Sequence, residues 1–258
     1  MGTRNLTVRG HTDGFGCQYN AILSGVAFCN NRSKYRFIHS PMRSVSHGWE
    51  ATEATHKLNE FIGIPDTCAN RRIHVKLSHV AKVFKNPTCF YNTPTLDLIR
   101  SYYYSTQKPA SRPEEIVVHI RRGDVGRHRS GDRRRRFITN SWYNRIIPLV
   151  AEKYPDHYRI AIYSEGEPQN FASIIEGWSS DLTERLSFRL ATDWIADQEN
   201  CLMSTFHNMV SAKVLIMSKS GLAYSAGILN DNDVYFVRSP AIGQTAPLTN
   251  WIRTSWGG

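Results

Sequence analysis

The sequence has no apolar run long enough to span a membrane. The longest apolar stretches among its 258 residues, such as 146–151 and 214–217, fall far short of the roughly 20 residues that a transmembrane helix needs. No apolar signal-peptide segment follows Met1. With 41% hydrophobic residues, the chain can nevertheless bury a substantial core. We therefore expect a soluble, cytoplasmic protein with one large globular domain or two small ones.

The cysteines are too scattered to form a disulfide framework or a zinc ribbon. There are five, an odd number, and none belongs to a Cys-x-x-Cys pair. The ten histidines include no His-Glu-x-x-His motif, which argues against a metal site. The Gly-x-Gly-x-x-Gly signature of a nicotinamide dinucleotide site is also missing. The sequence thus predicts neither a metal nor a bound cofactor.

Positive charge is plentiful and unevenly distributed. The chain has a formal net charge of +10, and the segment 121–136 holds eight arginines against two aspartates. Such a run indicates an anionic partner: a nucleic acid, a phosphorylated small molecule or an acidic surface. For 127–136 a solvated loop is a simple alternative. Arg121 and Arg122, by contrast, directly follow an apolar strand, which favours a role in binding.

Strands and helices alternate along the chain in the manner of parallel sheets. The polar segment 105–113, interrupted twice by proline, is the best candidate for a linker. Before it we expect strands at 6–9 and 35–39, and helices at 19–30, 53–61 and 96–104. After it we expect strands at 115–120, 158–163, 186–190, 213–217 and 234–237, and helices at 141–154, 169–178, 197–212 and 222–229. The predicted fold class is α/β, with Rossmann-like α/β/α halves at residues 1–110 and 111–258.

Three predicted strand-to-helix loops carry residue types that bind anions. In open parallel sheets, ligands bind beyond the carboxyl ends of the strands. The first loop spans 11–18, where glycines permit close backbone approach and a helix N-terminus offers amides. Its candidate residues are Asp13, Gly14, Phe15, Gly16 and Gln18. A tight turn without a ligand is the alternative interpretation.

The second loop contains the segment His-Ile-Arg-Arg-Gly-Asp. Alternation along the strand places His119 and Arg121 on the same face. The guanidinium groups of Arg121 and Arg122 match a pair of phosphate oxygens. Gly123 allows a sharp turn, and Asp124 can hold an arginine in place. Because the segment follows a buried strand, its Arg-Gly-Asp triplet does not indicate adhesion.

The third loop, 217–224, lies between another predicted strand and helix. Hydroxyl and amide groups of Ser218, Ser220 and Gly221, with Lys219 between them, form a possible second anion site at a helix N-terminus. Serine-rich helix caps are common, so this loop alone is a weak signal. Two such sites and an arginine pair, all at predicted strand ends, suit a diphosphate.

At these residues the sequence resembles a glycosyltransferase superfamily. The segment VVHIRRGDV (117–125) is similar to the His-x-Arg-Arg-x-Asp motif of the α1,2-, α1,6- and protein O-fucosyltransferases, including the nodulation enzymes. YSEGEPQNF (163–171) resembles their second motif, and FHNMVSAKVLIMSKSGLAYSAGIL (206–229) resembles the third. DGFGCQYN (13–20) is similar to their N-terminal glycine loop. These short motifs occur in the family's order over most of the chain.

The resemblance implies a GT-B enzyme in which two Rossmann-like halves face each other across a cleft. Acceptor contacts would lie mainly in the N-terminal half, and the nucleotide sugar, by default GDP-fucose, would bind the C-terminal half. Sugar transfer to a glycan hydroxyl would invert the anomeric carbon without a metal. Arg121 or Arg122 would neutralise the leaving diphosphate, His119 would face the nucleobase and Asp124 would support the arginines. The segment 218–220 would bind the β-phosphate.

Sugar transfer also needs a carboxylate that takes the proton of the acceptor hydroxyl. In one O-fucosyltransferase branch a Glu-Gly-Phe segment supplies this base, and the Asp-Gly-Phe at 13–15 matches it with a shorter acid. Asp13 is therefore our choice, with Glu165 and Asp193 as rivals. Asp193 and Asp197 are also candidates for recognising the nucleobase.

The resemblance leaves the donor and acceptor open. The chain is short for the family and shows no anchor or stem, which favours a cytosolic enzyme over a Golgi one. A UDP-pentose such as a xylosyl donor, or another deoxyhexose, could use the same diphosphate site. A protein of another class, which binds nucleic acid through 127–136, would show steep salt dependence but lacks a recognisable nucleic-acid motif. A sugar-binding protein with a decayed transferase fold is the third interpretation.

Overall fold

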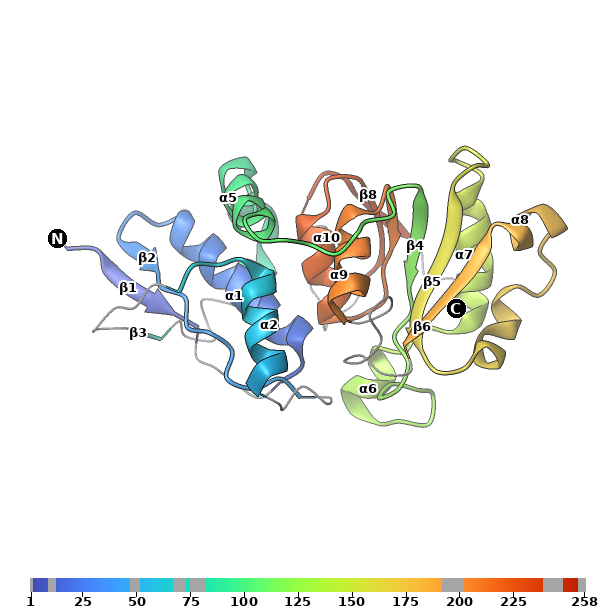
Figure 1. Ribbon diagram of the computed structural model, residues 1–258, viewed down its shortest axis with the longest axis horizontal. Coiled ribbons are helices and arrows are strands. Elements are labelled where there is room, and N and C mark those ends of the chain that lie inside the picture. The colour runs from blue at the N-terminus through green and yellow to red at the C-terminus, as the bar shows by residue number, and fades with distance from the viewer. Residues whose placement is uncertain are drawn as a thin grey trace. The chain divides into compact units, whose positions relative to one another are not determined.

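The computed structural model describes residues 2–8, 13–46, 52–66, 73–74, 82–191, 202–238 and 248–254 (Figure 1). The chain divides into two compact units. The first comprises Met1–Pro109 with Gly243–Thr249, and the second comprises Ala110–Ile242 with Asn250–Gly258. Within the described residues, no helix combines the length and apolar character needed to cross a bilayer.

The first unit contains a small parallel sheet and its helices. The three strands are ordered β2-β1-β3, and β1 pairs in parallel with both neighbours. The elements are β1 (Arg4–Thr7), α1 (Phe15–Asn30), β2 (Tyr35–Phe37), α2 (Thr52–Ile62), β3 (Ile73–His74), α4 (Pro87–Phe90) and α5 (Thr93–Tyr104).

Helix α1 begins four residues earlier than the sequence predicts. Gly14 is its N-cap residue, with an extended backbone at φ −62° and ψ 157°. The sequence predicts a loop for Phe15, Gly16 and Gln18, but these residues lie in the buried start of a helix. The reason is tertiary packing: Phe15 stacks on Tyr19 and contacts Phe61, so burial extends the helix to its first turn.

The second unit is built on a six-stranded sheet whose neighbours are all parallel. Its strand order is β6-β5-β4-β7-β8-β9. The strands are β4 (Glu115–His119), β5 (Arg159–Glu165), β6 (Leu186–Ala191), β7 (Val214–Ile216), β8 (Asp233–Val237) and β9 (Trp251–Thr254). The helices are α6 (Gly131–Arg135), α7 (Asn140–Ala151), η1 (Pro168–Ile174), α8 (Ser180–Glu184), α9 (Leu202–Ser211) and α10 (Gly221–Leu229). Two parallel-sheet α/β units confirm the predicted fold class.

Side chains of β4 alternate between the two faces of this sheet. Ile116 and Val118 belong to a fully buried apolar cluster that includes Trp142 and Ile147 of α7 and Phe171 of η1. Figure 1 shows α9 and α10 on the other side of the same strands. The sheet is thus covered on both faces, which explains why the β-branched run of β4 contains no exposed position.

Two predicted helices differ from the observed ones. The segment 169–178 forms the 3₁₀-helix η1 and not an α-helix, because the left-handed glycines Gly166 (φ 108°) and Gly177 (φ 78°) bound a segment opened by proline. The predicted helix 197–212 corresponds to α9, and its first residues lie outside the described part of the chain.

The strand order places one topological switch point in the larger sheet. From β4 the chain proceeds to β5 and β6 on one side, and then returns to β7 on the other side of β4. The connection after β4 leads to α7, whereas the connection after β7 leads to α10 on the opposite face. The carboxyl ends of β4 and β7 at this switch point are the usual ligand position in such sheets.

Candidate functional site

A hydrogen bond joins the carboxyl ends of β4 and β7 at this switch point. His119, the last residue of β4, lies with Nδ1 2.7 Å from the hydroxyl oxygen of Ser218, in the loop after β7. Both residues are buried, with exposed fractions of 5% and 2%. Two residues that the sequence assigns to separate binding loops are thus brought into direct contact.

The imidazole of His119 is held in its neutral form. Burial, and then the charge of Arg121, lower the pKa of His119 to about 3. A neutral ring in one of its tautomers donates from Nδ1 to the Ser218 oxygen, which leaves the hydroxyl hydrogen for another acceptor. That His119 faces a nucleobase stays a prediction. In the structure, the ring positions the hydroxyl of Ser218.

Arg121 emerges from the end of β4 and pairs with Asp124. Its Nε and Nη2 donate to the two carboxylate oxygens at 3.0 and 2.7 Å, a bidentate ion pair. The two side chains are 20% and 28% exposed, so the pair is partly shielded from water. The prediction that Asp124 holds an arginine in place is confirmed. One edge of the Arg121 guanidinium is engaged by Asp124, and within the described part of the chain no partner is seen for its other N–H groups.

Gly123 makes the turn that directs these arginines, and only glycine fits there. Its φ of 73° lies in the left-handed region. A Cβ at this position would lie 2.0 Å from Oε2 of Glu165, at the end of β5. Glu165, a rival for the role of base, is therefore packed against the turn.

Gly123→Ala is expected to lower the free energy of unfolding by about 2–3 kcal/mol. The left-handed backbone accounts for about 1–2 kcal/mol, and displacement of the Glu165 carboxylate accounts for the rest. Gly177→Ala is the matched control, because Gly177 has a similar φ of 78° and no atom within 4 Å of its Cβ position. Urea denaturation of the two variants measures the difference. Adding Glu165→Ala should reduce the loss of unfolding free energy in Gly123→Ala to that in Gly177→Ala. Equal losses in the two single glycine variants would contradict the close contact between Gly123 and Glu165.

The side chain of Arg122 has different partners from that of Arg121. Its guanidinium donates to the carbonyl oxygen of Arg121 at 2.8 Å and to Oδ1 of Asn140 at 2.5 Å. It also lies over the ring of Phe137, 4.7 Å from the centroid, and burial lowers its pKa. The sequence does not show which of the two arginines would neutralise a diphosphate. In the structure, Arg121 pairs with a carboxylate, whereas Arg122 donates to neutral acceptors and lies over an aromatic ring.

The loop after β7 ends in the N-terminus of α10. Ser220 is the N-cap, and its hydroxyl oxygen accepts the N–H of Leu222 at 3.1 Å. Gly221 is the first helical residue and is buried. Lys219 is half-buried, and burial lowers its pKa. Ser218, Ser220 and Gly221 thus form a short polar wall beside the end of β4.

In the first unit, the start of α1 is fixed by side-chain hydrogen bonds. Nε2 of Gln18 donates to the carbonyl oxygens of Asp13 and Ser44, at 2.6 and 2.8 Å. Asp13 is exposed, and its Oδ1 accepts the N–H of Gly14 at 2.8 Å. Among the described residues, no partner is seen for the second carboxylate oxygen of Asp13. Gln18 therefore has a structural role, whereas Asp13 presents its carboxylate to solvent.

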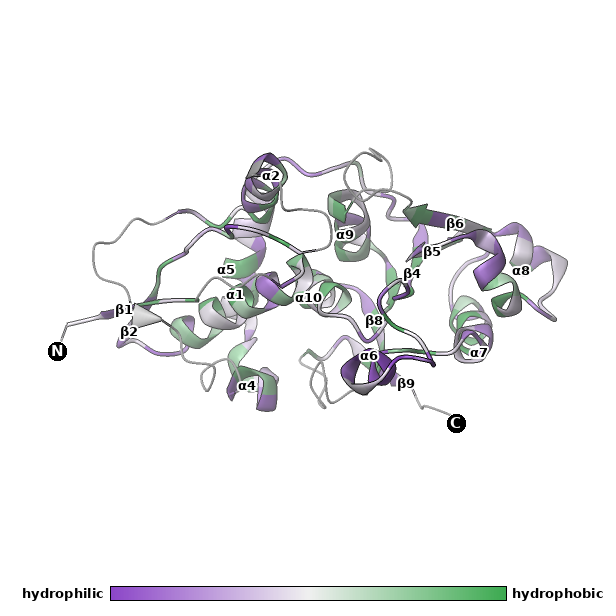
Figure 2. Ribbon diagram, turned by 90° about the horizontal axis from the view of Figure 1, so that it is seen from below, coloured by the Kyte–Doolittle hydropathy of each residue, from purple (hydrophilic) through white to green (hydrophobic). Residues whose placement is uncertain are grey.

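Asp193 and Asp197, predicted to recognise the nucleobase, lie outside the described residues. The arginine run forms the short helix α6, which the sequence did not predict. Its residues are exposed, and Figure 2 shows it at the hydrophilic end of the scale. One of its arginines, Arg135, lies 3.6 Å from Asp132 in an exposed ion pair, which contributes little to stability.

Among the described residues, no cluster of histidine, cysteine and acidic side chains could hold a metal ion. An Asp-x-Asp triplet does occur at 231–233, a spacing that often binds metals. Asp233 accepts a hydrogen bond from the hydroxyl of Tyr154. It also begins β8, so the triplet lies at the amino end of the sheet, away from the switch point.

Asn140 contacts Arg122 in a role that the sequence does not predict. Asn140 is the first residue of α7, and Thr139 is the actual N-cap. Nδ2 of Asn140 donates to the carbonyl oxygen of Asn170 and to the hydroxyl of Ser173, which turns Oδ1 towards Arg122. No local sequence signal marks this role, because the partners come from η1, thirty positions away.

Comparisons with known proteins give only distant likenesses. No family model matches the chain, and no curated protein matches it. Among solved structures, the E. coli heptosyltransferase WaaC with ADP-2-deoxy-2-fluoro heptose has a TM-score of 0.43 at 12% identity, covering 98% of this chain and 93% of that one. E. coli ADP-heptose LPS heptosyltransferase II has a TM-score of 0.43 at 9% identity, covering 99% and 92%. At this level of similarity, heptosyl transfer is not carried over to the present chain.

Proposed function

We propose that this chain is a nucleotide-sugar glycosyltransferase of GT-B type, with its donor site at the β4–β7 switch point. The observation that carries the proposal is the contact between His119 and Ser218. It brings the Arg-Arg-Gly-Asp turn and the N-terminus of α10 together at the carboxyl ends of β4 and β7. A guanidinium beside a helix N-terminus suits a diphosphate. The motif order that resembles the fucosyltransferases supports the same conclusion.

The proposed reaction is an inverting transfer without a metal. The acceptor hydroxyl oxygen forms a bond to the anomeric carbon as the bond from that carbon to the diphosphate oxygen breaks. Arg121 and the amide at Gly221 stabilise the charge that develops on the diphosphate. Asp13 accepts the proton of the acceptor hydroxyl. Asp124 and His119 act through other residues, by positioning Arg121 and Ser218.

Fucose, carried by GDP, is the donor that we propose first, because the resemblance is to fucosyltransferases. The diphosphate site itself does not distinguish sugars. A UDP-pentose or another deoxyhexose donor therefore remains the alternative. The acceptor is a hydroxyl group of a glycan or glycoconjugate.

Thermal stabilisation by nucleotides tests this proposal directly. The melting temperature is measured with GDP, UDP, ADP and their common sugar conjugates, because a ligand that binds only the native state raises it. A ligand at about 100 times its Kd adds about 2.7 kcal/mol of stability. We expect one nucleotide class to stabilise the wild type and to lose its effect in Arg121→Ala.

Stabilisation by all nucleotides in proportion to their charge, abolished by salt, would contradict the proposal. That result would favour nonspecific binding of polyanions by the arginine run. An absence of stabilisation by every nucleotide would also contradict it.

A further inference from the structure

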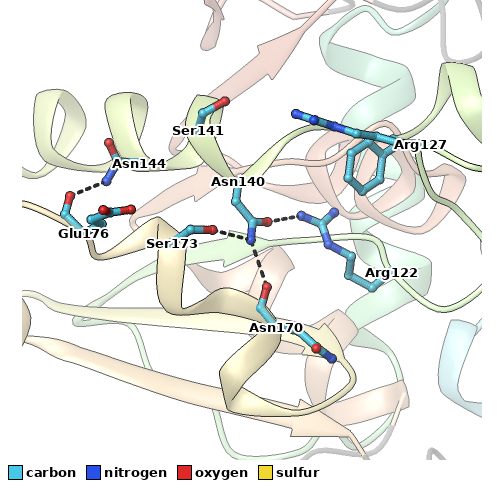
Figure 3. A pocket seen from close by; sticks show the side chains of 9 residues that line it. Arg122, Arg127, Asn140, Ser141, Asn144, Asn170, Ser173 and Glu176 are labelled. Carbon is cyan, nitrogen blue, oxygen red and sulfur yellow. Dashed lines mark hydrogen bonds between the residues drawn. The ribbon is translucent and has the colours of Figure 1, made fainter.

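A pocket of about 590 Å³ opens beside Arg122, on the α7 side of the sheet. Its lining includes Arg122 and Arg127 from the loop after β4, Asn140 and Asn144 from α7, and Glu176 after η1. Figure 3 shows the two arginines at one end and Asn144 and Glu176 at the other. The pocket therefore has a basic end and an acidic end.

The basic end contains a shielded cation that lacks an acidic partner among the described residues. The hydrogen-bond acceptors of Arg122 are both neutral, the carbonyl of Arg121 and Oδ1 of Asn140. The rings of Phe137, Tyr143 and Phe171 lie within 6.0 Å of its guanidinium carbon. A shielded charge without a counter-charge is costly, and an anionic ligand would offset that cost.

Arg122 is also held in a fixed orientation with spare donors. A guanidinium has five N–H groups, and two of those on Arg122 are used in hydrogen bonds within the described structure. Asn140 cannot rotate away, because its Nδ2 donates to Asn170 and Ser173. The exposed Arg127 adds a second positive charge at the same end of the pocket. A fixed guanidinium with a second one nearby matches a phosphate or carboxylate.

The other end of the pocket suits hydroxyl groups. The Glu176 carboxylate is exposed and can accept hydrogen bonds from hydroxyls. Nδ2 of Asn144 donates hydrogen bonds to the carbonyl oxygens of Ile174 and Glu176, which fixes the backbone at this end of the pocket. A molecule with an oxyanion at one end and hydroxyls at the other therefore complements the whole pocket.

We infer that this pocket binds a sugar bearing an oxyanion, with the anion on Arg122 and Arg127 and a hydroxyl on Glu176. The proposed diphosphate site lies on the side of α10, and the pocket lies on the side of α7, which covers the opposite face of the sheet. The inferred site is thus separate from the proposed diphosphate site, and the inference goes beyond the proposed function without resting on it.

Calorimetric titration of the full chain with sugar probes tests the inference. The probes are glucose 6-phosphate, glucuronate, inorganic phosphate and glucose. Comparing the first two distinguishes a preference for phosphate from one for carboxylate. Comparing inorganic phosphate and glucose with them separates the contribution of the anion from that of the sugar. We expect glucose 6-phosphate or glucuronate to bind at least about tenfold more tightly than glucose. Binding should be unchanged by a saturating concentration of the nucleoside diphosphate that stabilises the chain best.

Three variants and one control locate the site. Arg122→Gln should weaken binding of the acidic sugar at least about tenfold, and Arg127→Gln about threefold, because Arg127 is exposed. Glu176→Gln should weaken binding of the sugar phosphate and leave inorganic phosphate unaffected. Arg159→Gln is the control, because it removes an exposed arginine outside the pocket. If Arg122→Gln fails to fold, the exposed positions 127 and 176 still decide the result.

Failure of every acidic probe to bind would overturn the inference, and so would equal binding by the wild type and both pocket arginine variants. Competition between the nucleotide and glucose 6-phosphate would also overturn it, because both would then occupy one site. Binding of the acidic sugar by a chain that no nucleotide stabilises would refute the proposed transferase and leave the anion pocket standing.

Discussion

Arg121→Ala should lower kcat for sugar transfer by about a thousandfold, with the fold intact. Groups that neutralise charge on a transferring or departing phosphate contribute about 10²–10⁵ in rate, and no metal is proposed to share this role here. Arg121→Lys should recover part of the rate, because it restores the charge without the planar pair of donors. The measurement is kcat with the donor that the nucleotide panel identifies, and a melting curve to verify folding.

Arg185→Ala is the matched control for this variant. The Arg185 side chain is 14% exposed, compared with 20% for Arg121, and it likewise lies beside an aspartate, 3.3 Å from Asp156. It directly precedes β6, at the amino end of the sheet, where no ligand is expected. Removing the Arg185 side chain should change the stability of the protein but not kcat per folded molecule. Full activity in Arg121→Ala would refute the assignment of the diphosphate site.

The alternation of strands and helices could be predicted because the central strands of the larger sheet are buried on both faces. The run at 116–118 is apolar and rich in β-branched residues, which is typical of a buried strand. Strand β9 was not predicted because it lies at the edge of the sheet and only its first and last residues are buried, so its sequence lacks the apolar run of a central strand. Helix α6 was not predicted because its five residues include three consecutive arginines and show no helical repeat of apolar residues.

The pairing of site residues depended on strand order, which the sequence does not reveal. His119 and Ser218 are 99 positions apart, and they meet only because β7 returns to the side of β4. Each loop could be identified from its residue types, but not the hydrogen bond between them. The different directions of Arg121 and Arg122 were likewise hidden, because the acceptor that turns Arg122 belongs to α7.

Asp13→Asn should lower kcat by about a hundredfold or more while leaving nucleotide binding unchanged. General-base catalysis contributes about 10²–10⁴ in rate, and an amide cannot take the proton. The substitution retains Oδ1, which accepts the N–H of Gly14, so the start of α1 should keep its geometry. Asp13→Glu should restore activity, because the resemblance places a glutamate at this position. The readout is kcat beside the donor-induced shift in melting temperature.

Two further variants distinguish a catalytic carboxylate from a merely exposed one. Asp97→Asn removes another exposed aspartate of the first unit, on α5, and should leave kcat unchanged. Glu165→Gln tests the rival base, which lies against Gly123 at the end of β5. A loss of rate in Glu165→Gln, combined with full activity in Asp13→Asn, would transfer the role of base to Glu165. Because Glu165 contacts the arginine turn, that loss must be accompanied by unchanged nucleotide binding to indicate proton transfer and not a displaced Arg121.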